Sequence, residues 1–453
     1  MKVINPANNQ FIMNYTEHTE SEISDKLKNA EIAFQQWRKT SFAYRAELLK
    51  KAAEILQQRS REFAQLMTLE MGKLLRSGKA EAEKCAWVCD YYADNGESFL
   101  QDEIIETDAS KSFITYQPLG VILAIMPWNF PFWQVFRFAA PNLMAGNVGI
   151  LKHASNVPGC ALAIEEIFQA AGFPEHVFQT LLIGSDKVDE VIENPIVKAV
   201  TLTGSTPAGK SVAAAAGKVL KKCVLELGGS DPYIILVDAD IDKAVDLCIT
   251  SKLINSGQSC IAAKRFIVVD AVRDEFTTKI LRKMHEQKLG DPTDPETTIG
   301  PMARTDLRDE LHEQVQTSIT QGAKCLLGGK ILDLAGAFYP ATILTNVTKD
   351  MLAYKEELFG PVAVIIPAKD ETEAVRIAND SNFGLGAAIF TKDIKRGEIL
   401  ASKEIAAGCC FVNDFVKSDP RLPFGGIKGS GFGRELSKTG IWEFVNIKTV
   451  VIR

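Results

Sequence analysis

Apolar residues recur at helical spacing through the N-terminal part of the chain. The pattern predicts helices at residues 21–37, 42–59 and 61–94. Apolar and polar residues alternate at 112–116, just before a Pro-Leu-Gly turn, and this alternation predicts a strand. The N-terminal part is therefore expected to be helical up to that strand.

From residue 121 onward, short apolar runs alternate with segments of helical periodicity. The predicted strands are 121–125, 148–151, 177–181 and 199–202, and the predicted helices are 131–144, 159–171, 187–193 and 207–220. A second series has predicted strands at 233–237, 266–269, 362–366 and 387–390 and a helix at 241–253. Short apolar strands that alternate with helices are typical of parallel sheets covered on both faces, so the predicted fold class is α/β with two large domains.

The chain closes with an apolar-rich strand at residues 445–452. An unpaired strand edge at a terminus invites association with another chain. We therefore predict a subunit contact there, and an edge strand paired only inside the chain is the alternative.

Composition limits the classes of protein to which the chain could belong. Its 453 residues exceed the usual size of one hydrophobic core, and its net charge of −6 gives no electrostatic reason to expect nucleic acid as a partner. No run of about 18 apolar residues suggests a membrane span, and the N-terminus has no export signal, so a cytoplasmic location is expected. The nine cysteines show neither a disulfide framework nor zinc spacing, so they are expected to be reduced, and no metal is expected.

Two residues suggest covalent catalysis. Cys260 ends the segment Asn-Ser-Gly-Gln-Ser-Cys, and Glu226 ends an apolar run just before Gly228 and Gly229. Strand ends beside glycine turns are common active-site locations. A thiol and a carboxylate so placed suggest a nucleophile and a base.

One motif points to a different class of protein. Residues 204–211 read Gly-Ser-Thr-Pro-Ala-Gly-Lys-Ser, which matches a phosphate-binding P-loop between a predicted strand and a predicted helix. N–H groups at a helix start bind phosphate whichever nucleotide carries it. A P-loop nucleotide hydrolase is therefore a remote alternative, disfavoured because the other landmarks of the chain have no role in ATP or GTP hydrolysis.

Several short segments occur in the order found in one enzyme family. They are Pro-Trp-Asn-Phe-Pro at 127–131, Lys152, Thr-Gly-Ser at 203–205, Glu-Leu-Gly-Gly at 226–229, the segment ending in Cys260, Glu-Leu-Phe-Gly-Pro at 357–361 and Pro-Phe-Gly-Gly at 423–426. Through them the chain resembles the NAD(P)-dependent aldehyde dehydrogenases over almost its whole length. The resemblance implies a Rossmann-type nucleotide-binding domain (1–102 and 119–228), an α/β catalytic domain (229–430) and a small β oligomerisation element (103–118 and 431–453) of a homodimer or homotetramer.

The resemblance also implies oxidation of an aldehyde to a carboxylate through a cysteine thiohemiacetal and a thioester. An aldehyde carbon releases hydride only after a nucleophile has made it tetrahedral, and a Cys260 thiolate would make that attack. The Asn129 amide and the Cys260 N–H would stabilise the oxyanion, and Glu226 would activate the water that hydrolyses the thioester. The plainer alternatives are a buried structural thiol, a turn asparagine and a salt-bridged carboxylate, or a fold retained only for binding.

For the cofactor, the resemblance places a set of residues around the dinucleotide: Trp128, Lys152, Gly204, Ser205, Leu227, Glu357 and Phe359. Relatives selective for NAD commonly carry Glu three positions after this lysine, where it repels a 2′-phosphate. Ser155 stands there and adds no repelling charge, so we predict that NADP is preferred and NAD accepted. Ser155 as a helix N-cap before Pro158 is the alternative.

For the substrate, the chain resembles the succinate-semialdehyde dehydrogenase branch. Arg137 follows Asn129 on the predicted helix, and its guanidinium would bind the distal carboxylate of a short aldehyde. Trp133, Ser259 and Ser418 would line the same pocket. A structural ion pair is the alternative for Arg137, and another semialdehyde or an uncharged aliphatic aldehyde is the alternative substrate.

Overall fold

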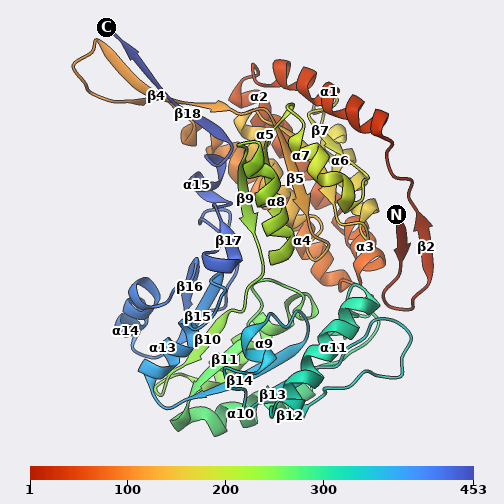
Figure 1. Cartoon of the computed structure of the whole chain (residues 1–453), viewed down its shortest axis with the longest axis vertical. Coiled ribbons are helices and arrows are strands. Elements are labelled where there is room, and N and C mark those ends of the chain that lie inside the picture. The colour runs from red at the N-terminus through yellow and green to blue at the C-terminus, as the bar shows by residue number, and fades with distance from the viewer.

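Two largely parallel sheets organise the chain, whose computed structural model describes residues 1–453 (Figure 1). The strands of the first sheet are β5 (Val121–Met126), β6 (Val148–His153), β7 (Phe178–Thr180), β8 (Val197–Thr203), β9 (Lys222–Glu226) and β17 (Gly431–Phe432). They lie in the order β17-β9-β8-β5-β6-β7, and only β17 runs antiparallel to its neighbour. Its helices are α5 (Trp133–Ala145), α6 (Pro158–Ala170), α7 (Val188–Glu193) and α8 (Thr206–Lys218).

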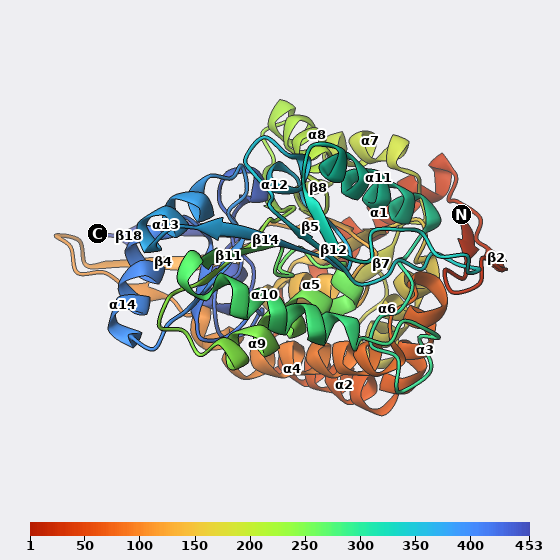
Figure 2. The same cartoon turned by 90° about the horizontal axis from the view of Figure 1, so that it is seen from below.

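The second sheet lies below the first in Figure 1 and has seven strands. Its strands are β10 (Pro232–Ile235), β11 (Arg265–Val269), β12 (Lys324–Leu327), β13 (Thr342–Thr345), β14 (Val362–Ala368), β15 (Gly386–Phe390) and β16 (Cys409–Val412). Its helices are α9 (Ile241–Leu253), α10 (Asp270–His285), α11 (Thr305–Thr320), α12 (Leu352–Lys355), α13 (Glu371–Asn379) and α14 (Ile394–Ile399). The order is β12-β13-β14-β11-β10-β15-β16, with helices on both sides when the chain is seen from below (Figure 2). The predicted α/β class is confirmed.

The N-terminal helices differ from the prediction at one break. They are α1 (Glu20–Trp37), α2 (Phe42–Gln58), α3 (Ser60–Met71) and α4 (Leu75–Phe99). The single helix predicted over 61–94 is wrong, because Gly72 ends α3 with a left-handed φ of 74°. A Cβ there would lie 2.6 Å from Cγ of Pro301, so this turn favours glycine. A hairpin of β1 (Lys2–Ile4) and β2 (Phe11–Asn14), which the pattern did not predict, precedes the helices.

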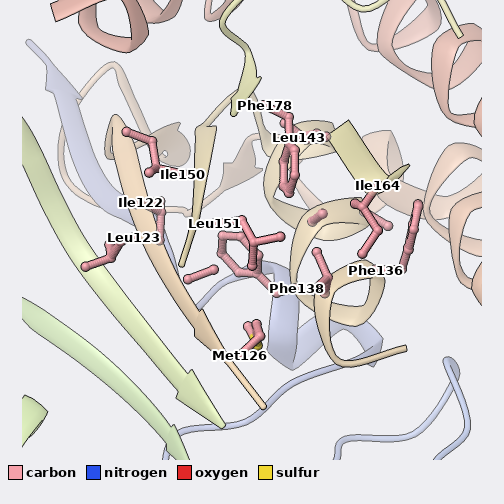
Figure 3. Close-up of a cluster of buried hydrophobic side chains, with 14 of the residues drawn as sticks. Ile122, Leu123, Met126, Phe136, Phe138, Leu143, Ile150, Leu151, Ile164 and Phe178 are labelled. Atoms are coloured by element: carbon pink, nitrogen blue, oxygen red, sulfur yellow. The ribbon is translucent and has the colours of Figure 1, made fainter. Parts of the chain in front are cut away.

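The largest core packs the helices against the first sheet (Figure 3). Apolar side chains of β5 and β6 meet those of α5 and α6, and the labelled ones are all nearly inaccessible to water. They include Ile122, Leu123, Ile150, Leu151, Phe136, Phe138 and Ile164. All residues of β5 and β6 are buried except Ile125, which is partly exposed, as expected for a sheet covered on both sides.

Three strands form an arm that projects from the first sheet in Figure 1. They are β3 (Glu103–Ile104), β4 (Lys111–Pro118) and β18 (Val445–Ile452), in the order β18-β4-β3. The predicted terminal strand is confirmed; β18 pairs with β4 along one edge, and its other edge has no partner strand. β17 pairs with β9 rather than with the arm, although the sequence analysis placed residues 431–453 together; the helix α15 (Ser437–Ile441) leads from β17 to β18. No helix combines the length and apolarity that a membrane span requires.

Candidate active site

The segment that leads to Cys260 has a left-handed backbone. Asn255, Ser256 and Gly257 have φ angles of 52°, 56° and 81°. A Cβ atom at Gly257 would stand 2.2 Å from the carbonyl oxygen of Gly360, which leaves no room for a side chain. Glycine is therefore required where this loop passes the chain that precedes β14.

Asn129, on the loop between β5 and α5, faces the same segment. Its Nδ2 donates to the carbonyl oxygen of Gln258 at 3.2 Å, and Asn255 Nδ2 donates to the carbonyl oxygen of Asn129 at 2.8 Å. The backbone N–H of Cys260 donates to no group of the chain. The structure thus places Asn129 against the segment that ends at Cys260, the residue with which it is predicted to form the oxyanion hole.

A cavity of about 670 Å³ opens at Cys260. Four residues predicted to bind substrate line it, namely Trp133, Arg137, Ser259 and Ser418. The other charged side chains in its wall are Lys73, Arg76, Glu81, Lys84 and Lys417. Three of the cations in the wall are paired with carboxylates: Lys73 with Glu81, Lys417 with Asp414 and Arg137 with Glu435. Arg76 and Lys84 have no carboxylate partner and favour an anionic ligand.

Burial sets the charge state of the thiol. It raises the pKa of Cys260 to about 12, while the nearby Lys264 and Arg137 oppose the rise. Lys264 Nζ donates to the carbonyl oxygen of Cys260 at 2.6 Å, so this cation lies directly behind the loop. The thiol is therefore protonated near neutral pH and loses its proton only as it reacts.

Glu226 is the last residue of β9, as the apolar run before it predicted. It is 2% exposed, and neither carboxylate oxygen has a hydrogen-bond partner in the chain. Its pKa is raised to about 8, chiefly by burial; Arg137 opposes the rise and Glu435 adds to it. Glu226 does not line the cavity at Cys260, so it stands near the thiol without facing it.

Arg137 lies on α5 between two buried carboxylates. Its Nε forms an ion pair with Glu435, its Nη2 lies 3.9 Å from Glu226, and Nη2 also donates to Thr203 Oγ1 at 3.2 Å. The ion pair that the sequence analysis had left open as an alternative is therefore present. Arg137 still lines the cavity, but its charge is largely balanced by the chain itself.

The residues predicted around the phosphates fit a dinucleotide. Lys152, near the end of β6, is 9% exposed, and its ammonium group has no hydrogen-bond or ion-pair partner in the chain. Burial lowers its pKa, an effect that a bound phosphate would offset. Gly204 and Ser205 lie between β8 and α8, and Ser205 Oγ accepts a hydrogen bond from the N–H of Ala208 at 3.4 Å. The start of a helix after a parallel strand suits a pyrophosphate.

The other residues predicted around the dinucleotide come from both sheets. Glu357 and Phe359 were predicted on the nicotinamide side and Trp128 on the adenosine and pyrophosphate side. Trp128, after β5, and Phe359, before β14, meet edge to face with ring centroids 5.9 Å apart. Glu357 accepts from the N–H of Gly229 at 3.1 Å and pairs with Lys264 at 3.1 Å. Leu227 packs closely on Gly209 of α8. A Cβ atom added to Gly209 would lie only 2.5 Å from Cδ2 of Leu227.

Ser155 is exposed just beyond β6 and does not cap a helix. The N-cap of α6 is Val157, without a side-chain hydrogen bond. Glu70 on α3 instead accepts from the N–H groups of Gly159 and Cys160, at 2.8 and 2.9 Å. The helix-cap alternative for Ser155 is therefore wrong.

Three charged residues at the site were not predicted from the sequence. They are Lys84 on α4, Lys264 before β11 and Glu435 after β17. A charge on a predicted helix or loop is most often solvated, so none carried a signal by itself. Only the packing of distant segments shows that they face the cavity or its neighbours.

Gly257→Ala should lower the free energy of unfolding by about 1–3 kcal/mol, because alanine is strained at this left-handed φ and its methyl group would collide with Gly360. The measurement is urea unfolding followed by circular dichroism. Gly217→Ala on α8 is the matched control, since no atom lies within 4 Å of its Cβ position, and it should be neutral or stabilising by up to about 1 kcal/mol. Equal stability of the two variants would contradict the strain argument.

The chain matches known proteins over its full length. It matches the aldehyde dehydrogenase family over residues 1–450. A protein named probable succinate-semialdehyde dehydrogenase [NADP(+)] from Synechocystis sp. is 54% identical over 449 residues, 99% of either chain, and the succinate-semialdehyde dehydrogenase [NADP(+)] 1 of Mycobacterium tuberculosis is 50% identical over 452 residues, also 99% of either chain. Among solved structures, the succinic semialdehyde dehydrogenase of Streptococcus pyogenes in complex with NADP+ superposes with a TM-score of 0.98 at 40% identity, covering 100% of this chain and 99% of that one. The chain therefore belongs to the aldehyde dehydrogenase family.

Proposed function

We propose that this chain oxidises succinate semialdehyde to succinate with NADP. Full-length relatives that bear this name support the proposal. The observation that carries it is the cavity, which joins the thiol of Cys260 to buried cations. A short substrate with an aldehyde and a carboxylate would place the aldehyde at Cys260 and the carboxylate at a cation of the same cavity.

The first step is the addition of Cys260 Sγ to the aldehyde carbon. The thiol loses its proton to water, the C–S bond forms, and the electron pair of the C=O double bond moves to oxygen. The Cys260 N–H and Asn129 Nδ2 would donate to this oxygen. Asn129 Nδ2 donates one N–H to the carbonyl oxygen of Gln258 at 3.2 Å, and its second N–H remains to donate.

The tetrahedral carbon then loses hydride and becomes a thioester of Cys260. A bound NADP would supply the acceptor for this hydride. Glu226 would take a proton from water as the water oxygen attacks the thioester carbon, and the C–S bond breaks to release the acid and restore Cys260. Its side chain would have to turn towards the cavity for this step, because it does not line the cavity in the structure. Because its pKa is about 8, the basic form accumulates as pH rises through 8, and turnover should rise with it.

The dinucleotide would lie along the ends of β6, β8 and β9, between the first sheet and the loop before β14. Lys152 and the start of α8 would hold its phosphates, and Glu357 and Phe359 its nicotinamide half. Ser155 is exposed three residues after Lys152, and its uncharged hydroxyl would not repel a 2′-phosphate. With the domain bounds expected from the sequence, residues 1–102 and 119–228 would hold most of the dinucleotide and 229–430 would supply Cys260. Both domains would contribute to each task, because Asn129 and Glu226 come from the first, and Glu357 and Phe359 from the second.

The arm supports assembly into a homodimer or homotetramer. The free edge of β18 carries exposed apolar side chains at Ile447, Val451 and Ile452. An exposed apolar edge of this kind favours pairing with another chain. The nine free cysteines suit a reducing compartment such as the cytoplasm.

Initial rates with succinate semialdehyde, glutarate semialdehyde and hexanal, each with NADP and NAD, test the activity. Succinate semialdehyde with NADP should have the highest kcat/KM, because it matches the cationic cavity and the uncharged Ser155. Cys260→Ala should lose activity by a factor of about 10⁴ or more, since the covalent route is removed.

The matched control is Cys248→Ala, which alters a buried thiol on α9 that takes no part in the proposed chemistry. Near-parental rates in Cys260→Ala would contradict the mechanism. A clear preference for hexanal would contradict the proposed substrate but not the chemistry.

Ser155→Glu should shift the cofactor preference from NADP towards NAD by about 10- to 100-fold, because a carboxylate at this position repels the 2′-phosphate and accepts from ribose hydroxyls. The ratio of kcat/KM for the two cofactors is the measurement. Ser402→Glu is the matched control. It adds the same charge just before β16 of the second sheet and should leave the ratio of kcat/KM values unchanged. A parental preference for NAD would refute the role of Ser155.

Sedimentation velocity should show an oligomer for the parent protein and a 49.7 kDa monomer for the double variant Ile447→Lys and Val451→Lys, because charges on the edge of β18 oppose pairing. Val237→Lys, at an exposed apolar residue after β10, is the control and should keep the parental state. A monomeric parent protein would exclude the proposed assembly.

A further inference from the structure

We propose that Lys264 is a positioning residue for the reaction at Cys260, because it orients the backbone oxyanion donor and stabilises the thiolate from behind the loop. The inference rests on the proposed function, in which Cys260 is the nucleophile. It concerns a side chain that does not line the cavity at Cys260.

Three oxygen atoms surround the ammonium group of Lys264. The residue is 1% exposed and lies just before β11. Its Nζ donates to the carbonyl oxygens of Ser259 and Cys260, each at 2.6 Å, and lies 3.1 Å from Oε1 of Glu357. An ammonium group has three N–H donors, so each donor has an acceptor. Two of the three acceptors belong to the segment that ends at Cys260.

The bond to Ser259 determines the direction of the Cys260 N–H. The carbonyl group of Ser259 and the N–H of Cys260 belong to the same peptide group, which is planar and trans, so they point in opposite directions. A cation that holds the carbonyl oxygen therefore fixes the N–H on the other side, where it donates to no group of the chain. The same bond polarises the peptide group and strengthens its N–H as a donor.

The charge of Lys264 also acts on the thiol. Burial raises the pKa of Cys260 to about 12, and Lys264 is the charge that opposes this rise most, ahead of Arg137. The carboxylates of Glu357 and Glu226 add to the rise. Lys264 is therefore the main cation that stabilises the thiolate as Sγ loses its proton.

Glu357 connects Lys264 to the proposed nucleotide site. Besides pairing with Lys264, it accepts from the N–H of Gly229 in the turn after β9, at 3.1 Å. A Cβ atom at Gly228 would collide with Oε2 of Glu357, and one at Gly229 would lie 2.6 Å from the carbonyl oxygen of Cys260. The turn after β9, the Cys260 segment and Glu357 are thus packed together around one ammonium group.

A second lysine nearby does not share this role. Lys252 on α9 is inaccessible to water, and its Nζ has no hydrogen-bond partner. Burial lowers its pKa well below the usual value, Lys264 lowers it further and Glu357 raises it. Two adjacent ammonium groups would repel each other in a buried site, and only Lys264 has acceptors. Lys264 is therefore the charged member of the pair.

The decisive experiment measures alkylation of Cys260 by iodoacetamide without aldehyde or dinucleotide, followed by mass spectrometry of the peptide that contains Cys260. Lys264→Met should slow this alkylation by about 3- to 10-fold at about pH 8, because less of the thiol is ionised. The rate should rise with pH in both proteins, and the variant should need a higher pH to reach the parental rate. Lys369→Met, at an exposed lysine just after β14, is the matched control and should leave the rate unchanged.

Lys264→Arg separates the charge from the geometry. A guanidinium keeps the charge, so alkylation should return to within about 2-fold of the parental rate. Its planar fork does not place one nitrogen among three acceptors, so kcat for the preferred aldehyde should stay about 10-fold below the parent, with KM within about 3-fold. Lys264→Met should lower kcat by about 10- to 100-fold.

Two further variants keep the proposal falsifiable if Lys264→Met folds poorly. Lys264→Gln is neutral and still able to donate, and it should slow alkylation as Lys264→Met does. Glu357→Gln should have the opposite effect and speed alkylation by about 2- to 5-fold, because it removes an anion that opposes the thiolate and leaves the charge of Lys264 unbalanced.

The outcomes separate this inference from the proposed function. Parental alkylation rates in the neutral variants, or equal slowing in Lys264→Arg, would overturn the inference alone, since the charge of Lys264 would then have no effect on the thiol. The proposed function fails in a different measurement, if the parent protein oxidises no aldehyde or if Cys260→Ala keeps its activity.

Discussion

The buried guanidinium of Arg137 is the contact on which the charged interior of the site depends. It lies between Glu226 and Glu435, both almost inaccessible to water. An unpaired carboxylate at this depth would be neutral or would destabilise the fold, because burial strongly disfavours the charged form. Arg137 lowers the pKa of both carboxyl groups, but burial still keeps each pKa above its usual value. A base that is only partly ionised near neutral pH follows from this arrangement.

The same contact determines which charged side chains of the cavity can bind a ligand. Arg137 is paired with Glu435, whereas Arg76 and Lys84 have no carboxylate partner. The loop before Cys260 is held equally firmly, by the left-handed turn that ends at Gly257. Catalytic geometry of this kind depends on rigid neighbours, because small displacements of a reacting group are costly.

Much of the fold was predictable because its strands are buried on both faces and its helices have apolar stripes. The strands at 121–125, 148–151 and 199–202 and the helix at 241–253 were all found close to their predicted bounds. The errors lie where a long-range contact outweighs local periodicity. Gly72 interrupts a helical pattern because the chain turns against Pro301, and the N-terminal hairpin is too short and too exposed to leave a clear pattern.

The sequence by itself determined the α/β class, the family resemblance and the placement of Glu226 at a strand end, because these depend on local patterns and on the order of short motifs. It also left Arg137 with two possible partners, a substrate carboxylate or an acidic side chain elsewhere. Only the tertiary structure decided that Glu435 is that side chain, and only it brought Lys84 beside Ser418, more than three hundred residues further along the chain. Charge balance in a buried site is a sum over all neighbours, and those neighbours are known only once the chain has folded.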